Sequence, residues 1–514
     1  MTDQTFMITT PIYYVNGDPH IGHAYTSIAA DVIARFRRLD GADVFFLTGT
    51  DEHGQKVEQA AEAAGLSPKA FADEVSARFR AMADRLGISY DRFIRTTDPD
   101  HYAAVAALWS RLEAAGAIYL GAYEGWYAVR DEAFYGEDEL RTDASGRRIA
   151  PSGAPVEWVR EPSWFFRLSD WQDRLLALYE ERPDFLGPSR SRNEITSFVR
   201  SGLKDLSISR TSFAWGIPVP GDPSHVVYVW LDALVNYISA LGFPDENNPL
   251  WRFWPADIHL VGKEIARFHA VYWPAFLMAA GIEVPRRIYS HGWWTNEGEK
   301  MSKSLGNAID INALTDEFGV DAVRFFLLRE VPFGNDGDFS RASLISRLNT
   351  ELANDLGNLA QRTLSQIARN CDGRLPARGE ATEDDSLLLA SADALPALVR
   401  AALDRLALQE ALEEVWKVIR ASNAYIDRQA PWVLKKTDIE RMGAVLRVLV
   451  SVLRRVATVL QPYMPASMAR LLDQLGVPPD ARRIADLGSP LLTGTPLPAP
   501  QGIFPRHVAA DAAS

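Results

Sequence analysis

Residues 5–47 read TFMITTPIYYVNGDPHIGHAYTSIAADVIARFRRLDGADVFFL, and this stretch decides the fold. Thr5–Thr10 and Val44–Leu47 are apolar runs of residues that favour β-strands. Between them, Ile21–Leu39 carries apolar residues at a helical period. A strand, a helix and a second strand in such a short stretch predict a right-handed βαβ unit and therefore a parallel sheet.

The composition is that of an ordinary globular protein, with 47% hydrophobic and 24% charged residues in 514. Such a length exceeds one hydrophobic core and predicts about two to four domains. The net charge of −13 argues weakly against nucleic-acid binding, although an acidic body can carry a local basic strip. The single cysteine, Cys371, excludes an internal disulfide. Neither a signal peptide nor an uncharged membrane-spanning run is present, so we expect a cytoplasmic protein without a membrane partner.

The character of the sequence changes several times along the chain. From about residue 116, turn residues, strand-like runs and tryptophans indicate an inserted α+β subdomain. Sheet-forming sequence returns at His225–Trp230, Asp257–Gly262 and Arg287–His291, and the chain after residue 340 is nearly all helical. We therefore expect the following units: 1–115, the first half of a Rossmann-like domain; 116–224, the insert; 225–297, the second half; 298–343, a loop and connecting segment; 344–480, a helical bundle; and 481–514, a tail that packs back.

The segment His20-Ile21-Gly22-His23 opens the expected helix, beyond the carboxyl end of the first strand, where ligands of parallel sheets bind. Unpaired N–H groups and the helix dipole attract phosphate at such a helix start. Gly22 lets a nucleotide approach the backbone, and both histidines can donate hydrogen bonds to phosphate oxygens. An isolated H-x-x-H string would more often be a surface helix cap.

A second segment, Lys300-Met301-Ser302-Lys303-Ser304, lies between two glycines, Gly298 and Gly306. A glycine-flanked loop with two ammonium groups can close over a triphosphate, and such loops commonly gate catalysis. Taken alone, the string would be a solvated basic turn. Together the two segments predict ATP chemistry by positioning and charge stabilisation, without a covalent protein nucleophile.

Further strings accompany these two segments. They are Ile12-Tyr13-Tyr14-Val15-Asn16-Gly17, Thr48-Gly49-Thr50-Asp51-Glu52-His53-Gly54, Trp230-Leu231-Asp232-Ala233-Leu234, Gly262-Lys263-Glu264-Ile265 and Phe268-His269. In this combination the chain resembles the methionyl-tRNA synthetases, a family of class I aminoacyl-tRNA synthetases, over nearly its full length. The resemblance implies an ATP-dependent methionine–tRNA ligase that forms methionyl-adenylate and transfers methionine to tRNA(Met). The implied fold is α/β, a split Rossmann-like parallel-sheet catalytic domain with an inserted α+β subdomain, followed by an all-α anticodon-binding bundle.

The resemblance also implies roles for individual residues. The implied catalytic residues are His20, His23, Lys300 and Lys303. The implied ATP-binding residues are Gly22, Gly262, Lys263, Glu264, Lys300, Ser302 and Lys303, with Glu264 suited to a ribose hydroxyl. Mg²⁺ is expected to accompany ATP, held by its phosphates.

A methionine site requires an apolar and aromatic sleeve, because the thioether sulfur favours aromatic edges. Residues at several separate strand ends supply this sleeve, and they match the family's pocket: Ile12, Tyr14, Trp230, Ala233, Leu234, Tyr237, Phe268 and His269. Asp51 is the expected partner of the α-ammonium group, against the alternative that it caps the following helix. We hypothesise that Tyr14 or His269 places a hydrogen-bond donor near the sulfur.

The insert departs from many members of this family, whose knuckle carries cysteines where this chain has Ala128 and Asp131. Residues 145–159 likewise contain neither Cys nor His. A structural zinc site needs four ligands of these kinds, so we expect no structural zinc and no other protein-bound metal.

The helical region carries a candidate site for the tRNA anticodon. Asn358 and Arg362 are spaced i and i+4 on one helix face, and Trp432 follows the end of another helix. RNA loops are read by stacking of bases on aromatic rings and by hydrogen bonds to base edges. These three residues match the family's anticodon-binding positions.

Three alternatives stay open from the sequence. Sister enzymes for leucine, isoleucine or valine would usually carry a larger editing insertion, and the cysteine enzyme would need a zinc set that is absent. A nucleotidyltransferase that does not act on tRNA has no need of the helical region. A tRNA-binding protein without catalysis would not need His20, His23, Asp51, Lys300 and Lys303. The default expectation for the assembly is a monomer.

Overall fold

The computed structural model describes residues 4–131, 133–301 and 309–507 of the chain. Its central sheet has six strands in the order β3-β2-β1-β14-β15-β9, and each neighbouring pair is parallel. These strands are β1 (Thr5–Tyr14), β2 (Asp43–Asp51), β3 (Arg92–Arg95), β9 (Leu186–Gly187), β14 (Ile258–Gly262) and β15 (Ile288–His291). The predicted α/β class with a parallel sheet is confirmed. The strand order reverses between β1 and β14, which is where such sheets bind ligands.

Strands β1 and β2 run further than the sequence predicted. Residues 11–14 and 48–51, expected beyond the strand ends, are their last residues. A register shift in β1 between Thr9 and Ile12 allows the extension, and Tyr14 pairs with Asp51. Two predicted ligand-binding residues therefore lie side by side at the carboxyl edge of the sheet.

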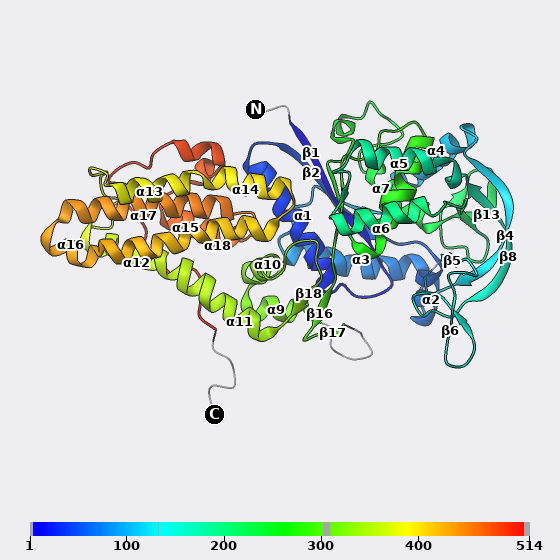
Figure 1. The fold of residues 1–514 in the computed structure, drawn as a ribbon, viewed down its shortest axis with the longest axis horizontal. Coiled ribbons are helices and arrows are strands. Elements are labelled where there is room, and N and C mark those ends of the chain that lie inside the picture. The colour runs from blue at the N-terminus through cyan, green and yellow to red at the C-terminus, as the bar shows by residue number, and fades with distance from the viewer. Residues whose placement is uncertain (1–3, 132, 302–308, 508–514) are drawn as a thin grey trace.

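Helices cover both faces of the sheet (Figure 1). Along β1, Phe6 and Ile8 belong to one hydrophobic core and Met7 to the other, because successive side chains of a strand point to opposite faces. On the first face lie α1 (Ile21–Leu39) and α3 (Pro68–Arg85), preceded by α2 (Gln55–Ala63). On the second face lie α4 (Pro99–Ala114), α7 (Val229–Ser239) and α8 (Trp273–Ala279). Helix α1 has the bounds that its hydrophobic period predicted.

The insert is built on a long antiparallel pair, β4 (Ile118–Ala128) with β8 (Glu157–Phe166). Smaller elements complete it: β5 (Ala133–Tyr135), β6 (Arg141–Thr142), β7 (Arg148–Ile149), α5 (Gln172–Glu181), α6 (Ser189–Arg200), β10 (Leu206–Ser207), β11 (Ser209–Arg210), β12 (Pro218–Val219) and β13 (Asp222–Val227). One expectation for this region was wrong, and one strand was not anticipated. The stretch 225–230 is not a strand of the parallel sheet, because β13 pairs antiparallel with β11 and β12 and α7 begins at Val229. The edge strand β9, in contrast, comes from within the insert.

A small sheet links the α/β body to the helical part. It contains β16 (Trp294–Asn296), β17 (Glu299–Lys300) and β18 (Gly337–Phe339), with α9 (Ile311–Phe318) and α10 (Val320–Arg329) between them. The helical part follows, seen on the left of Figure 1: α11 (Arg341–Arg347), the π-helix η6 (Leu348–Gly357), α12 (Asn358–Asn370), α13 (Glu383–Asp393), α14 (Leu395–Asp404), α15 (Leu408–Gln429), α16 (Pro431–Thr437), α17 (Ile439–Leu460) and α18 (Pro465–Gln474).

One helical stretch of the described residues, Glu383–Asp404, is long and apolar enough to cross a membrane by composition alone. It comprises α13 and α14, which pack on α15 and α17 of the bundle. The tail beyond α18 returns along this bundle, and its Ile503 is buried. Arg454 of α17 donates to the carbonyl oxygen of Ser489 at 2.6 Å, which fixes the tail to the bundle.

A buried ion pair joins the α/β body to the helical part. The guanidinium group of Arg324, on α10, donates to the Asp31 carboxylate of α1 at 2.6 Å, and both side chains are fully buried. Arg324 also donates to the carbonyl oxygens of Leu86 (3.1 Å), Pro462 (2.7 Å) and Tyr463 (3.0 Å). One side chain thereby ties α1, the end of α3 and the corner between α17 and α18.

Arg324→Met would leave the buried Asp31 carboxylate without this partner. We expect a loss of about 3 kcal/mol of stability and a lower midpoint of thermal unfolding, because breaking a buried ion pair strands a charge. Arg405→Met is the control, since Arg405 and Glu410 form a pair that is 62% and 60% exposed. This control should cost less than about 1 kcal/mol. Equal midpoints for the two variants would contradict the expectation.

Candidate active site

A cavity of about 940 Å³ opens at the carboxyl ends of β1, β2 and β14, where the strand order reverses. It is lined by residues from both halves of the α/β body and from the segment after β15. The predicted site residues that line it are Ile12, Tyr14, His20, Gly22, His23, Asp51, Trp230, Ala233, Leu234, Tyr237, Gly262, Glu264 and His269. The fold therefore gathers into one cavity residues that lie up to some 250 positions apart in the sequence.

The N-terminus of α1 forms one side of this cavity. His20 caps the helix, and its Nδ1 accepts from the backbone N–H of Gly22 at 3.1 Å. The Nδ1 of His23 accepts in turn from the backbone N–H of His20 at 3.1 Å. Burial, together with the nearby His20, lowers the pKa of His23 well below its ordinary value. The neutral His23 ring therefore carries its proton on Nε2.

Gly22 leaves room for the capping ring of His20. A Cβ atom there would approach the Cε1 atom of His20 to 2.9 Å, so a larger residue would displace the capping ring. The two imidazole rings lie 3.8 Å apart, and both face the cavity beside the helix start. The arrangement presents imidazole groups and the positive end of a helix dipole to whatever anion enters.

Aromatic and apolar side chains form a second part of the cavity lining, called here the aromatic wall. Trp230, in the first turn of α7, stacks on Phe268 with ring centres 3.7 Å apart and an interplanar angle of 6°. Phe268 itself is not among the lining residues and supports Trp230 from behind. Ile12, Ala233 and Leu234 add apolar surface. This half of the cavity suits an apolar ligand group.

A polar chain lies at the base of this wall. The Nδ1–H of His269 donates to the carbonyl oxygen of Ile265 at 3.0 Å, so its Nε2 accepts from the Tyr237 hydroxyl at 2.7 Å. Burial lowers the pKa of His269 to about 4, which keeps the ring neutral. Both ring nitrogens are therefore engaged within the protein. His269 therefore has no N–H group left to donate to a thioether sulfur. Of the two donors hypothesised from the sequence, Tyr14 and His269, this geometry disfavours His269.

Asp51 lies at the end of β2 and lines the cavity with a side chain that is almost fully buried. The alternative role considered for it, capping the next helix, is wrong. The N-cap of α2 is Gly54, and no side chain caps that helix. The position and charge of Asp51 instead suit a cationic ligand group.

The end of β14 forms the third side of the cavity. Gly262 and Glu264 line it, and the indole N–H of Trp293 donates to the Glu264 carboxylate at 2.6 Å. Lys263 does not line the cavity. Its ammonium group forms an ion pair with Asp336 at 2.6 Å and lies 4.1 Å from the centre of the Trp293 ring. The structure therefore does not bring Lys263 to the site expected for it.

The lysine-rich segment begins at the edge of the cavity. Lys300 ends β17, which pairs antiparallel with β16, and Met301 lines the cavity. Ser302 and Lys303 lie outside the described residues. The segment thus starts where it could act on a ligand held by His20 and His23.

Some lining residues were missed from the sequence. They are Asp18, Thr26, Lys56, Asp131, Asn236, His291 and Trp293. His291 is the last residue of β15, so the rule that ligands bind at strand ends could have found it. Lys56, with its ammonium group 5.5 Å from the centre of the Tyr14 ring, gave no sequence signal beyond its charge.

Apolar packing and hydrogen bonds are seen in the knuckle of the insert. Ala128 lies in a small apolar core with Ala150 and Ala154. Asp131 accepts hydrogen bonds from the hydroxyl groups of Tyr135, at 2.9 Å, and Ser152. Across the described ranges no cluster of His, Cys, Asp or Glu could hold a metal ion. The absence of structural zinc stays a prediction.

The three candidate anticodon residues lie at the far end of the helical part. Asn358 and Arg362 are one turn apart on α12, and Trp432 is in the first turn of α16. The Arg362 guanidinium lies 5.1 Å from the centre of the Trp432 ring and pairs with Asp427 at 2.5 Å. Trp432 is 37% exposed, which is high for a tryptophan. An exposed aromatic ring beside a guanidinium group suits base stacking.

The location of the cavity determines the class of protein. A cavity beside a helix start, at the reversal point of a split parallel sheet that is joined to a helical bundle, fits the architecture of a class I aminoacyl-tRNA synthetase. Residues 6–364 match the family model described as tRNA synthetases class I (M), and residues 375–512 match the anticodon binding domain of methionyl tRNA ligase. The chain therefore belongs to the methionine–tRNA ligase family.

Relatives support this membership over the whole chain. The methionine–tRNA ligases of Mesorhizobium japonicum and Brucella suis are each 56% identical, with 99% of both chains covered. The solved structure of Mycobacterium tuberculosis methionyl-tRNA synthetase in complex with methionyl-adenylate has a TM-score of 0.96 at 54% identity, covering 98% of this chain and 100% of that one. The chain is thus an enzyme, an ATP-dependent ligase that activates methionine and charges tRNA with it.

Trp230→Ala would open the aromatic wall of the cavity. We expect the KM for methionine to rise about tenfold or more, because a stacked indole ring supplies much of the apolar contact area. The KM for ATP should stay within about twofold, because Trp230 is assigned to the methionine site and not to ATP binding. Trp158→Ala is the control, because that ring is 55% exposed on the insert, outside the cavity. ATP–pyrophosphate exchange measures both constants, and a parallel rise in both would contradict the assignment.

Proposed function

We propose that this cavity carries out methionine activation with the roles that the sequence suggested. Asp51 holds the α-ammonium group of methionine and leaves its carboxylate able to attack the α-phosphate of ATP. The carboxylate oxygen forms a bond to phosphorus, and pyrophosphate departs with the electrons of the broken P–O bond. The observation that carries the proposal is the single cavity in which Asp51 and the aromatic wall meet the start of α1.

The charge of the departing pyrophosphate is stabilised by groups on two sides. The Nε2–H of His23 and the N-terminus of α1 approach from the sheet. The other contribution is assigned to the ammonium groups of Lys300 and Lys303, and the hydroxyl of Ser302 is assigned to ATP binding. ATP enters as its Mg²⁺ complex with the ion held by phosphate oxygens. Glu264 binds the ribose and Gly262 allows the nucleotide to approach β14.

The thioether lies against the aromatic wall formed by Trp230, Phe268 and their neighbours. Ile12, Tyr14, Ala233, Leu234 and Tyr237 complete the sleeve, and His269 supports Tyr237 through their hydrogen bond. Because the N–H of His269 is engaged by Ile265, the donor near the sulfur is assigned to Tyr14, the other residue of the hypothesis.

In the second step the acceptor-end ribose of tRNA(Met) takes the methionyl group, at the 2′-hydroxyl as expected for class I. Asn358, Arg362 and Trp432 read the anticodon, the two polar side chains at base edges and the indole ring by stacking. The chain carries out these tasks in separate units, whose boundaries we place at residues 115, 224, 297, 343 and 480. We further propose a cytoplasmic monomer without structural zinc.

The first test is methionine-dependent ATP–pyrophosphate exchange. We expect exchange with methionine and little with leucine or cysteine, and Asp51→Asn should raise the methionine KM about thirtyfold or more. Removing one partner of a buried charge pair commonly costs that much. Asp316→Asn is the control, since Asp316 is exposed and pairs with Arg85 outside the cavity. An unchanged methionine KM in Asp51→Asn would refute the ammonium assignment.

The second test separates the two ends of the molecule. Trp432→Ala should lower tRNA charging at least about tenfold and leave exchange unchanged, because base stacking on an aromatic ring contributes about 1–3 kcal/mol per base. Leu387→Ala on α13 is the control, a residue that is 64% exposed away from Arg362. A parallel loss of exchange would show that Trp432 stabilises the fold and does not act by binding tRNA.

A further inference from the structure

Four successive polar residues at the end of β2, Thr50 to His53, are all buried. Buried polar and charged groups are costly unless each one finds partners. Within this run, Asp51 lines the cavity, whereas Glu52 and His53 do not. The contacts of Glu52 and His53, the two residues after Asp51, therefore determine how Asp51 is held.

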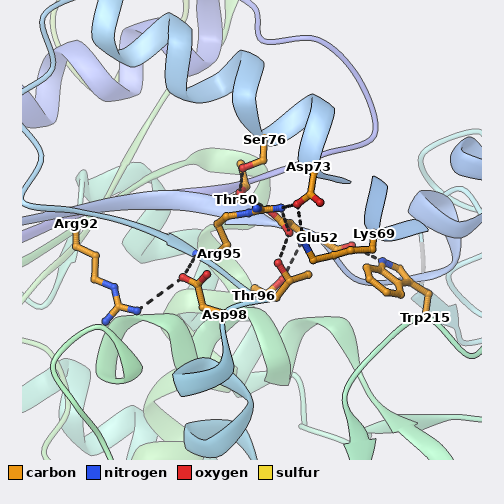
Figure 2. Close-up of polar contacts among 11 residues, drawn as sticks. Thr50, Glu52, Lys69, Asp73, Ser76, Arg92, Arg95, Thr96, Asp98 and Trp215 are labelled. Carbon is orange, nitrogen blue, oxygen red and sulfur yellow. Dashed lines mark hydrogen bonds and ion pairs between the residues drawn. The ribbon is translucent and has the colours of Figure 1, made fainter. Parts of the chain in front are cut away.

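Glu52 is fixed by β3 and the residues that follow it (Figure 2). The guanidinium group of Arg95 donates to both of its carboxylate oxygens, at 2.6 and 2.8 Å. The hydroxyl groups of Thr50 (2.8 Å) and Thr97 (2.6 Å) donate to the same carboxylate. The Thr96 hydroxyl accepts from the backbone N–H of Glu52 at 2.9 Å. A bidentate pair with these additional bonds specifies one orientation of the chain.

His53 is fixed by different elements. Its Nδ1 lies 2.7 Å from the Asp232 carboxylate on α7, and its Nε2 lies 3.0 Å from the Tyr102 hydroxyl on α4. The other oxygen of Asp232 is 2.7 Å from Nε2 of His101. Burial alone would raise the pKa of Asp232, but the two imidazoles lower it below its ordinary value. Helix α7, which also carries Trp230, is thus tied to the residue that follows Glu52.

We propose that the Glu52–Arg95 pair and the His53–Asp232 pair together position Asp51. They hold its carboxylate in the cavity, where the amino group of methionine would bind. The inference rests on the proposed role of Asp51 as the partner of the α-ammonium group. Glu52 and His53, the two residues that follow Asp51, are bonded to β3 with its following residues and to α7, so a shift of the Asp51 backbone would strain these contacts. Glu52 and Arg95 are positioning residues, because neither of them lines the cavity.

The outer side of this cluster supplies a matched control. Arg95 also donates to Asp73 at 2.5 Å, and Asp73 pairs with Lys69, but the Asp73 side chain is 45% exposed. Exposed ion pairs contribute little. Asp73→Asn removes a negative charge that contacts Arg95 and keeps the Glu52–Arg95 bonds.

The experiment compares Glu52→Gln with Asp73→Asn in ATP–pyrophosphate exchange. Glu52→Gln should raise the methionine KM about 10–100-fold, the usual effect of losing a group that orients a ligand-binding residue. The ATP KM should stay within about twofold, and Asp73→Asn should change neither. A methionine KM within twofold of the wild-type value, or a parallel rise of both constants in Glu52→Gln, would overturn the inference.

Two further variants separate positioning from folding. Thr97→Val removes one bond to Glu52, is milder, and should raise the methionine KM alone by a smaller factor. Glu52→Gln/Arg95→Met removes both charges of the pair, so it should recover thermal stability while the methionine KM stays high. Recovery of both properties would show a purely structural role and overturn the inference. If Asp51→Asn leaves the methionine KM unchanged, the proposed role of Asp51 is itself refuted. If Asp51→Asn raises the methionine KM and Glu52→Gln does not, only the positioning role is refuted.

Discussion

The ion pair between Asp31 and Arg324 is the contact on which the arrangement of the two parts depends. Asp31 accepts from Arg324, from Arg35 at 2.7 Å and from the backbone N–H and the hydroxyl of Ser89. Burial raises the pKa of such a carboxyl, but Arg324, Arg35 and these hydrogen bonds lower it below its ordinary value. The charge therefore persists inside the protein. Because Asp31 lies on the helix that His20 caps, the contact links the helix start beside the cavity to the helical part.

Helix α10, which carries Arg324, makes two more contacts of this kind. The Asp321 carboxylate accepts from the backbone N–H of Ser467 at 2.5 Å, near the start of α18. Arg329 donates to Glu351 of η6 at 3.0 Å and to Glu413 of α15 at 2.6 Å. One short helix thus bonds to α1, η6, α15 and α18. These ion pairs and hydrogen bonds hold the helical part against the α/β body.

The sequence predicted the fold where one local signal was sufficient. The helical period of Ile21–Leu39 determined α1 to the residue, and the strands at 258–262 and 288–291 were recognised. The prediction was wrong where strand pairing determines the sheet to which a strand belongs. Residues 225–227 have strand propensity, but they pair with β11 and β12 and so lie outside the main sheet. The edge strand β9 spans two residues and carries too short a pattern to detect. Charge alone could not place Lys263 either, because its partner Asp336 lies 73 positions away.

The buried carboxylates around the cavity share one physical pattern. Asp31 pairs with Arg324, Glu52 with Arg95, and Asp232 with the imidazoles of His53 and His101. Each of these pairs satisfies a charge that burial would otherwise penalise by several kcal/mol. Among the buried acidic residues of the described ranges, Asp51 is the one that also lines the cavity. The partners of these carboxylates hold them in one orientation, and Glu52 directly follows Asp51 in the sequence. If Asp51 binds an ammonium group as proposed, a displacement of its carboxylate would weaken that attraction, because the Coulomb energy falls with distance.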